Sequence, residues 1–226
     1  MIIESNGITI ERLREKDIEM VREWRNSRFV KQYMLHQETI TAEMQKKWFK
    51  SKDNFNNFYF ILIYKGKKVG LGNINSVFWD KKQGEVGIFV ADKSLIGSIL
   101  PIVGSLTLSD IIFKIFRLKR IVAQIREDNP RSKKLSKLIG AKLAEKQDSE
   151  ESKLYHIYPE DFYKSTKKFF MLMKPMGFSR GSMKISFDNY DIETGFAQKF
   201  IILLEDAELN FKKTEKENEI IFTEIG

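Results

Sequence analysis

The spacing of apolar residues predicts that the chain opens with a strand and an amphipathic helix. Apolar and polar residues alternate over residues 8–13, as in a half-buried strand. Ile18, Val21 and Trp24 then recur at helical spacing behind Asp17, which can cap the N-terminus of this helix. Residues 25–34 are expected to continue as a short loop or a broken helix.

A second helix and three antiparallel strands are expected next. Thr39 or Thr41 is a suitable N-cap for that helix, which should end near Ser51. Three runs rich in β-forming residues follow, and short turns at Lys65 and Gly66 and at residues 80–84 separate them. These runs predict a meander over residues 58–64, 67–77 and 85–90.

A long helix and a strand–helix–strand–strand order follow the meander. The helix is expected over residues 98–116, with Pro101 tolerated in its first turn. A buried strand over residues 118–125 leads to a turn at Asn129 and Pro130, and Gly140 ends a helix over residues 131–139. The last two strands are expected at residues 141–145 and 153–158. This order predicts an α+β fold of three layers, in which helices flank a mixed, mostly antiparallel sheet.

The last quarter of the chain has a different character. Pro175, Gly177 and Gly181 mark a linker, after which a strand, a helix and a strand are expected over residues 183–190, 196–209 and 219–223. Such a β-α-β unit is too small to be very stable alone. The predicted organisation is a main domain over residues 1–166, a linker over 167–182 and a small α/β extension over 183–226.

The composition excludes several classes of site. The 226 residues include no Cys, which rules out disulfides, thiolate metal ligands and a Cys nucleophile. The first residues lack the apolar core of a signal peptide, and no apolar run is long enough to span a membrane. The net charge of +8 is spread along the chain among acidic residues, which favours a solvated surface over a nucleic-acid-binding patch. We therefore expect a cytoplasmic protein with no membrane span, no nucleic-acid partner and no metal site.

Several short motifs occur in the order typical of one enzyme family. They are Leu13-Arg14, Asp17, Trp24-Arg25-Asn26, Val30, Met34, Ile40-Thr41, Trp48-Phe49, Val69-Gly70, Glu85-Val86-Gly87-Ile88, Asn129-Pro130-Arg131-Ser132 and Gly140. Over about residues 8–165 the chain thus resembles the GNAT N-acetyltransferases. The opening resembles most the branch that acetylates nucleotide-linked amino sugars, as in the pseudaminic acid pathway, and less closely the branch that acetylates ribosomal proteins.

The resemblance implies how the acetyl donor, acetyl-CoA, would bind. In this family the strands that correspond to residues 85–90 and 118–125 splay apart, and the pantetheine arm pairs with the open edge near Phe89 and Val90. A backbone N–H group there can bind the oxyanion that forms during acetyl transfer. Asn129 would help to hold the coenzyme arm, and Ser132 would lie at the start of the next helix. The alternative for both residues is an Asn-Pro turn with a Ser cap.

The turn from Asp92 to Pro101 departs from the family pattern. A glycine-rich turn normally presents its backbone N–H groups to the pyrophosphate of coenzyme A. The expected glycines fall at Gly97, Ile99 and Pro101, so that only the first is present. Other contacts to the phosphates would have to come from Lys93, Ser94 and Ser98.

The resemblance also suggests groups for the chemistry. Glu85 is the candidate base, directly or through water, and burial beside apolar neighbours would raise its pKa. The alternative is a surface carboxylate on an exposed strand. Ser136 occupies the position at which many relatives carry a Tyr that protonates the departing thiolate. Because a Ser hydroxyl is a poor acid, water, Tyr155 or Tyr158 would have to replace it.

The acceptor is expected to bind where the first two helices meet the sheet. Arg25 could pair with a substrate phosphate, whereas core packing explains Trp24 better than direct substrate contact does. The residues expected around the acceptor are Trp24, Arg25, Asn26, Met34, Gln45 and Trp48.

The function that this pattern favours is acetyl transfer to a primary amine, most consistently one on a nucleotide-linked amino sugar in surface glycan synthesis. Two alternatives stay open. One is a GNAT-fold binding or scaffolding protein with a degenerate donor site, and the other is an enzyme that takes its acyl group from an acidic acyl-carrier protein. A homodimer is an option because the apolar helix over residues 98–116 and the C-terminal extension need cover.

Overall fold

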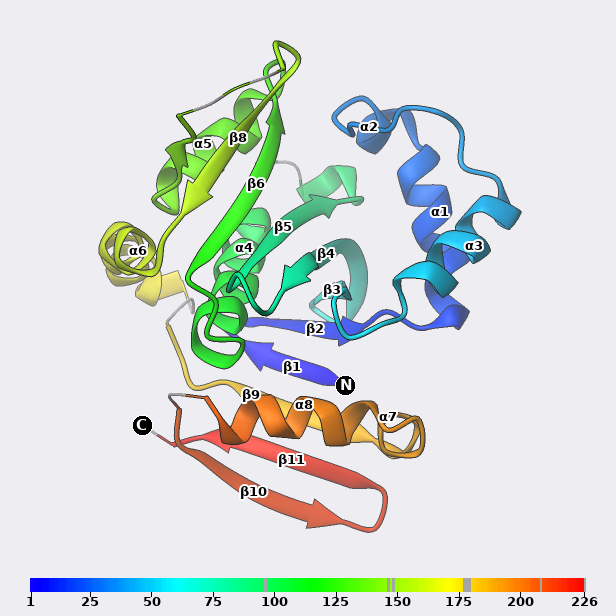
Figure 1. The fold of residues 1–226 in the computed structure, drawn as a ribbon, viewed down its shortest axis with the longest axis vertical. Coiled ribbons are helices and arrows are strands. Elements are labelled where there is room, and N and C mark those ends of the chain that lie inside the picture. The colour runs from blue at the N-terminus through cyan, green and yellow to red at the C-terminus, as the bar shows by residue number, and fades with distance from the viewer. Residues whose placement is uncertain (96, 146, 148, 177–179, 208, 226) are drawn as a thin grey trace.

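The strands of this protein form one mixed sheet (Figure 1). The computed structural model describes residues 1–95, 97–145, 147, 149–176, 180–207 and 209–225. Eleven strands follow the order β10-β11-β9-β1-β2-β3-β4-β5-β6-β8-β7. Neighbouring strands are antiparallel except β5 and β6, which are parallel. The strands are β1 (Ile2–Ser5), β2 (Ile8–Arg12), β3 (Phe58–Tyr64), β4 (Lys67–Phe78), β5 (Gln83–Val90), β6 (Arg120–Arg126), β7 (Lys142–Leu143), β8 (Ser152–Ile157), β9 (Lys184–Asp188), β10 (Phe211–Lys216) and β11 (Glu219–Glu224).

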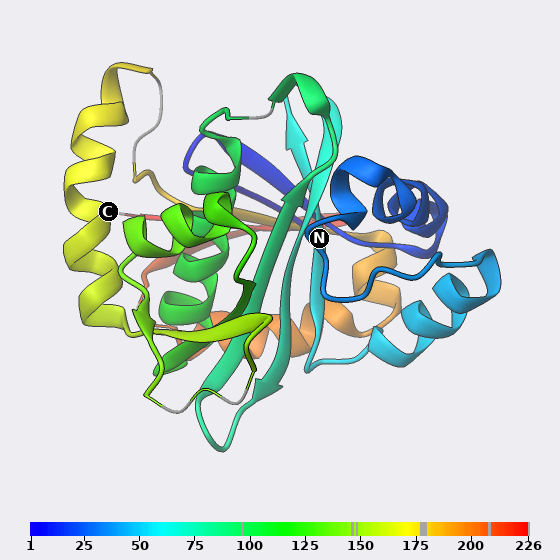
Figure 2. The ribbon, with the colours of Figure 1, turned by 90° about the horizontal axis from the view of Figure 1, so that it is seen from above.

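Helices cover both faces of the sheet and make three layers (Figure 2). The helices are α1 (Ile18–Asn26), α2 (Arg28–Lys31), α3 (Ala42–Lys52), α4 (Leu100–Asp110), α5 (Pro130–Leu138), α6 (Pro159–Met173), α7 (Asn189–Glu193) and α8 (Phe196–Glu205). Helices α1 to α3 lie on one side, and α4, α5 and α6 lie on the other. Helix α8 shares the α4 side, because the ring of Phe200 contacts those of Phe58 and Phe116. The expected α+β fold with a mostly antiparallel sheet is confirmed.

Helix α4 is the central helix of the core. It is apolar on all sides and almost all of it is buried, as expected for a helix enclosed by other elements. Two glycines let it approach the sheet closely. A Cβ atom on Gly104 would lie 2.4 Å from Cδ1 of Ile88, and one on Gly72 would lie 2.8 Å from Cδ1 of Leu108. After Asp110 the helix continues as one π-helical turn, Ile111–Ile115, within the range predicted as a single helix.

The region predicted as a linker, residues 167–182, begins with helix. Helix α6 runs from Pro159 to Met173 across the expected boundary at residue 166, and residues 177–179, including Gly177, lie outside the described part of the chain. The buried side chains of Phe162, Thr166 and Phe170 recur every four residues and hold α6 against the core. Residues 167–173 are therefore helical, because the helical spacing of apolar residues outweighs the breakers that follow.

The C-terminal extension continues the sheet. Strand β9 pairs with β1, so that Ile2 faces Ser186 and Ile3 faces Ile185. The extension contains two helices and three strands, whereas one helix and two strands were predicted; α7 and β10 were missed. Strand β1 was missed as well, although Asn6 and Gly7, both at positive φ, form the tight turn typical of a hairpin. The division of the chain into domains stays a prediction.

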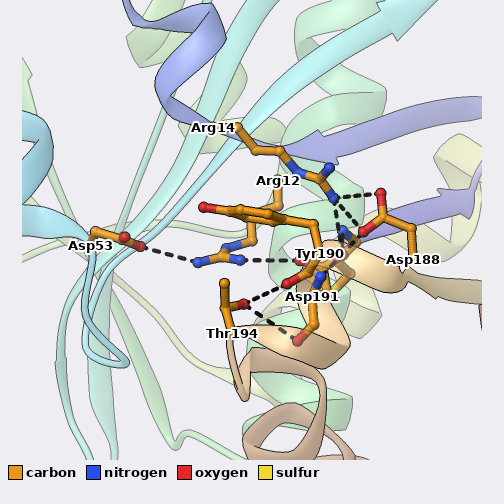
Figure 3. Close-up of polar contacts among 8 residues, drawn as sticks. Arg12, Arg14, Asp53, Asp188, Tyr190, Asp191 and Thr194 are labelled. Carbon is orange, nitrogen blue, oxygen red and sulfur yellow. Dashed lines mark hydrogen bonds and ion pairs between the residues drawn. The ribbon is translucent and has the colours of Figure 1, made fainter.

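A buried carboxylate fastens the extension to the first strands (Figure 3). Asp191 of α7 has no exposed side-chain surface, and Nη1 of Arg12 lies 3.0 Å from its Oδ1. Nη2 of Arg14 lies 3.2 Å from Oδ2 of Asp191, which also contacts the amino group of Met1. Two guanidinium groups and one amino group thus surround one buried anion. Such a pairing is needed to offset the cost of burying the charge.

The two arginines also contact acids and rings at the edge of this network. Arg12 reaches Asp53 at 3.1 Å, and Arg14 reaches Asp188 at 2.7 Å. The guanidinium of Arg12 lies 3.7 Å from the ring centroid of Phe196. Burial alone raises the pKa of Asp188, but hydrogen bonds from Arg14 and from the N–H group of Asp191 outweigh burial and lower it. Asp188 is therefore an ionised partner for Arg14 at neutral pH.

Replacing Asp191 with Ala is expected to lower the free energy of unfolding by about 3–5 kcal/mol, because two arginines lose their buried partner. Denaturant unfolding measures this change. Asp53→Ala is the matched control, since it removes the exposed partner of the same Arg12 and should cost less than about 1 kcal/mol. Equal costs for the two variants would contradict the account of this network.

Candidate active site

The parallel strands β5 and β6 pair only at one end (Figure 1). Gln83, Gly84 and Glu85 of β5 face Arg120, Ile121 and Val122 of β6. Beyond these three pairs the strands diverge, and the described residues of β5 and β6 make no further ladder contact. The other edge of β5 stays paired with β4 as far as Val90. The backbone of residues 86–90 thus presents a free edge toward β6, and such an edge is a ready partner for an extended chain.

An irregularity in β4 lies beside the point of divergence. The pairing of β4 with β5 shifts between Asn75 and Phe78, and Ser76 adopts a positive φ of 51°. A bulge of this kind bends its strand and increases the local twist. Asn75 faces Glu85, the last residue of β5 that is paired on both edges. The bulge and the divergence therefore occur at the same level of the sheet.

A chain of amide groups positions Glu85. Nδ2 of Asn73 donates to Oδ1 of Asn75, and Nδ2 of Asn75 donates to Oε2 of Glu85 at 2.9 Å. Gly87 leaves room for this chain, because a Cβ atom there would lie 2.8 Å from Oδ1 of Asn73. The burial expected for Glu85 is wrong, since its side chain is exposed. Glu85 stands at the vertex of the opening, held by Asn75 and open to solvent.

Arg25, Trp48 and Tyr59 lie together on the same face of the sheet as Glu85. The rings of Trp48 and Tyr59 meet edge to face, with centroids 4.8 Å apart. Burial raises the pKa of Tyr59 to about 12; Arg25 opposes this rise and Glu85 adds to it. Burial also lowers the pKa of Arg25. Among the described residues Arg25 has no ion-pair partner, and its buried Nε atom has no hydrogen-bond partner.

The other residues expected around the acceptor have varied positions. Trp24 packs in the small apolar cluster between α1, α3 and the sheet. The side chain of Asn26 holds the loop before α3, because it donates to and accepts from the backbone of Ile40, both at 2.8 Å. Gln45 is only 3% exposed, and its Nε2 atom has no partner among the described residues. Met34 is half-buried in the loop after α2. The structure thus brings Arg25 and Trp48 toward Glu85 and gives Trp24 and Asn26 packing and loop contacts.

A pocket of about 170 Å³ opens where β3 meets the C-terminal extension. Its lining includes Arg12 and Tyr59 from the main sheet and Tyr190, Phe196 and Lys199 from the extension. Because Tyr59 also contacts Trp48, the extension contributes side chains beside the face that carries Arg25 and Glu85.

His156 was missed by the sequence reasoning. Glu85 faces Val122, and Val122 faces His156 of β8, so the three residues form one row across the sheet. Facing residues point to the same side of a sheet, which places the imidazole on the face of Glu85. Burial, and secondarily the charge of Arg120, lowers the pKa of His156, so it is neutral at pH 7. Tyr155, the neighbour of His156, points to the opposite face.

Asn129 and Ser136 belong to the segment of α5, the helix that follows β6 in the chain. Oδ1 of Asn129 accepts a hydrogen bond from the N–H group of Ser132 at 3.1 Å, which caps α5. Ser136 is buried on the same helix. The cap of α5 is thus Asn129 and not the Ser of the alternative, and a role of Asn129 toward a coenzyme stays a prediction.

In the turn between β5 and α4, the backbone N–H groups of Ser94 and Ser98 donate to acceptors within the turn itself. Oδ1 of Asp92 accepts from the N–H group and the hydroxyl of Ser94, at 2.9 and 2.7 Å. The N–H group of Ser98 donates to the carbonyl of Leu95 at 3.1 Å. Gly97 has a φ of +76° and faces open space, whereas Ile96 lies outside the described residues. Hydrogen bonds from Ser94 lower the pKa of Asp92, so the turn carries an ionised carboxylate.

The match to known proteins agrees with this geometry. The acetyltransferase (GNAT) domain family matches residues 8–142. The chain belongs to the GNAT acetyltransferase family. No curated protein matches the chain. The family match does not distinguish the amino-sugar branch from the ribosomal-protein branch.

Solved structures share the fold of this acetyltransferase at low identity. A domain from Methanocaldococcus jannaschii is 24% identical, with a TM-score of 0.59, and the match covers 69% of this chain and 99% of that one. A probable acetyltransferase is 17% identical, with a TM-score of 0.60 and coverage of 71% and 98%. A spermidine N-acetyltransferase from Vibrio cholerae, solved with CoA and spermine, is 14% identical, with a TM-score of 0.61 and coverage of 69% and 98%. These matches leave about 30% of this chain uncovered.

GNAT acetyltransferases use acetyl-CoA, and the site fits this donor in part. The free edge of β5 suits the extended pantetheine arm; the side chain of Phe89 packs with the cluster of Trp48 and Tyr59, and that of Val90 packs on the α4 side. The phosphates would meet Gly97, Ser98 and the exposed Lys93. The carboxylate of Asp92, by contrast, repels an anion. Among the described residues no group of His, Asp and Glu side chains could hold a metal ion, and no helix is long and apolar enough to cross a membrane.

Asp92→Asn is expected to strengthen acetyl-CoA binding about threefold at low salt. Asn keeps an oxygen that can accept the hydrogen bonds from Ser94, so the variant removes the charge and retains the turn. Calorimetric titration measures the dissociation constant, and the gain should shrink at high salt. Asp80→Asn, in the turn between β4 and β5, is the control with the same loss of charge. An unchanged constant in Asp92→Asn would mean that the phosphates bind elsewhere.

The pH dependence of stability tests the burial of Tyr59. Since the folded state raises the pKa of Tyr59 from 10.0 to about 12, its stabilising contribution is complete below pH 10 and is lost as the pH rises toward 12. Tyr59→Phe keeps the ring and has no ionisable hydroxyl. Between about pH 10 and 12 the free energy of unfolding should fall in the parent protein by on the order of 2 kcal/mol more than it does in Tyr59→Phe. Urea unfolding at a series of pH values measures these free energies. If they fell equally with pH in the parent protein and in Tyr59→Phe, Tyr59 would ionise as an exposed tyrosine does.

Proposed function

We propose that this N-acetyltransferase acetylates the primary amine of a nucleotide-linked amino sugar, as used in the synthesis of surface glycans. The observation that carries the proposal is Arg25, a half-buried guanidinium with no ion-pair partner among the described residues. Arginine stays charged at neutral pH even when burial lowers its pKa. A buried cation without a partner is costly, and a substrate phosphate would supply two charge-assisted hydrogen bonds in the planar geometry that arginine favours.

The rings beside Arg25 suit the rest of such an acceptor. Trp48 and Tyr59 form an aromatic corner against which a base or a sugar ring can pack. Tyr59 keeps its proton at neutral pH, so its hydroxyl can donate a hydrogen bond to a sugar or phosphate oxygen. The Vibrio cholerae structure in the same fold was solved with spermine, a polycation. The unpaired Arg25 would repel a polyamine from this face.

The chemistry requires a deprotonated amine beside an activated acetyl group. Glu85, held by Asn75, accepts the proton of the substrate ammonium, directly or through water. His156, neutral at pH 7 in the same row, is a second proton acceptor for a water chain. The amine nitrogen then bonds to the acetyl carbon, and a backbone N–H group of the free β5 edge binds the oxyanion. The nitrogen releases its second proton to water as the bond from carbon to sulfur breaks, which leaves the amide and the CoA thiolate. The thiolate takes its proton from solvent, because Ser136 is a poor acid.

A substrate panel tests this proposal. We expect a nucleotide-linked amino sugar to have a kcat/KM at least about tenfold above that of the free amino sugar and of spermidine, since a charged hydrogen bond contributes about 1.5–3 kcal/mol. Release of CoA thiol measures turnover. Arg25→Gln should remove the preference by raising KM for the nucleotide-linked substrate, with kcat nearly unchanged. Arg28→Gln, at an exposed cation of α2, is the matched control. Preference for spermidine, or for the free sugar, would overturn the proposal.

A further inference from the structure

Helix α6 presents an unusual outer surface to solvent. At 100° per residue, four exposed lysines fall on one arc of the helix and its last turn: Lys164, Lys167, Lys168 and Lys174. Met171 and Leu172 lie on the same arc and are 70% and 66% exposed. An isolated apolar residue on a surface is ordinary. Two adjacent ones among four cations form a basic amphipathic surface.

Helix α5 extends this surface. Lys134 and Lys137 of α5 share an open groove with Lys168 and Leu172 of α6, and Leu138 lies in the groove between them. The two helices lie side by side on the flank opposite α1 to α3 (Figure 2). We call this flank the α5–α6 face; it consists of the six lysines named above together with Met171 and Leu172.

The positive charge of the α5–α6 face is not neutralised within the protein. None of its six lysines has an ion-pair partner among the described residues. Of the acids near it, Glu127 pairs with Lys133 at 2.6 Å and Asp161 pairs with Lys142 at 2.7 Å, whereas the exposed Glu160 lies one turn before Lys164 on the same arc. With six lysines against this one acid, the face carries an excess of positive charge across two helices, which attracts an anionic surface.

The face is also firmly supported. Phe162 and Phe170 anchor the inner side of α6 in the core. The guanidinium of Arg180 lies 5.3 and 5.1 Å from the centroids of these two rings and 3.4 Å from Oδ1 of the buried Asp110. Met171 and Leu172 are thus held outward by a packed helix. They do not have to be released from the core in order to contact a partner.

We propose that the α5–α6 face binds the surface of an anionic lipid bilayer. Lysines near such a surface are attracted to acidic headgroups, and their apolar stems and the side chains of Met171 and Leu172 can enter the boundary with the acyl chains. A bilayer fits better than an acidic protein because Met171 and Leu172, the most exposed apolar side chains among the described residues, add apolar surface among the lysines. This surface is distinct from the acceptor face, and the inference does not depend on the identity of the acceptor.

Cosedimentation with vesicles tests the inference on the full chain. The protein should bind vesicles of phosphatidylcholine with 30% phosphatidylglycerol at least about tenfold more tightly than pure phosphatidylcholine, and 0.5 M salt should weaken that binding. Lys134→Glu with Lys168→Glu should weaken it by about tenfold or more. Met171→Ser with Leu172→Ser should also weaken it by about tenfold. Thermal melting of each variant shows whether it is folded.

The matched control reverses two charges elsewhere. Lys46 and Lys50 are exposed on α3, on the opposite flank, and the double change of both to Glu alters net charge by the same amount. This control should bind as the parent does. The inference would be overturned if the control lost as much vesicle affinity as the Lys134 and Lys168 variant. It would also be overturned if the parent protein bound neutral vesicles as tightly as anionic ones. Binding to polyglutamate without binding to vesicles, or an unchanged affinity in the Met171 and Leu172 variant, would overturn it as well, because each would indicate a polyanion in place of a bilayer.

Discussion

The divergence of β5 and β6 is the constraint on which this structure depends. Parallel strands normally pair along their length, and unpaired backbone groups inside a sheet are costly unless another partner satisfies them. Here the pairing stops at Glu85 and Val122, while β4 keeps the other edge of β5 in place. The result is a rigid strand with one free edge in the middle of the protein. The donor arm of an acetyltransferase can complete this edge.

The residues around the opening are arranged by the same divergence. Glu85 occupies the vertex, and the amide chain from Asn73 and Asn75 reaches it from the bulged part of β4. Arg25 and Tyr59 lie near it on the same face of the sheet, and Asn129 caps α5, the helix that follows β6. The C-terminal extension leaves this region intact because it joins the sheet at the opposite end. There the buried Asp191 and its three nitrogen partners, from Met1, Arg12 and Arg14, fasten it to β1 and β2.

Local patterns in the sequence predicted the local structure well. The range of β3 agrees with the predicted strand, and Thr41 caps α3 through a hydrogen bond to the N–H group of Met44 at 3.1 Å. The pairing of β9 with β1 was not predicted, because it joins segments about 180 residues apart and no local pattern encodes it. Helix α6 was missed because Pro175 and the glycines after it led us to end the main domain at residue 166 and to expect a linker there.

The site was predictable in its residue types and less so in its geometry. The motif order indicated Glu85 and Arg25, but the exposure of Glu85 depends on which face of β5 the helices cover. The side chain of Asn26 makes two hydrogen bonds with the backbone of Ile40, and these depend on a loop conformation that the sequence does not specify. His156 was overlooked because its place in the same row as Glu85, two strands away, follows from the register of three strands that are far apart in the chain.

Hydrogen–deuterium exchange with and without acetyl-CoA tests the central claim most directly. If the donor arm pairs with the free edge of β5, amides of residues 86–90 should become protected by at least about tenfold on binding, together with those around Gly97 and Ser98. The amides of β9 to β11, at the other end of the sheet, should exchange as before. Saturating acetyl-CoA that leaves residues 86–90 unprotected, or that protects only the C-terminal extension, would contradict the account.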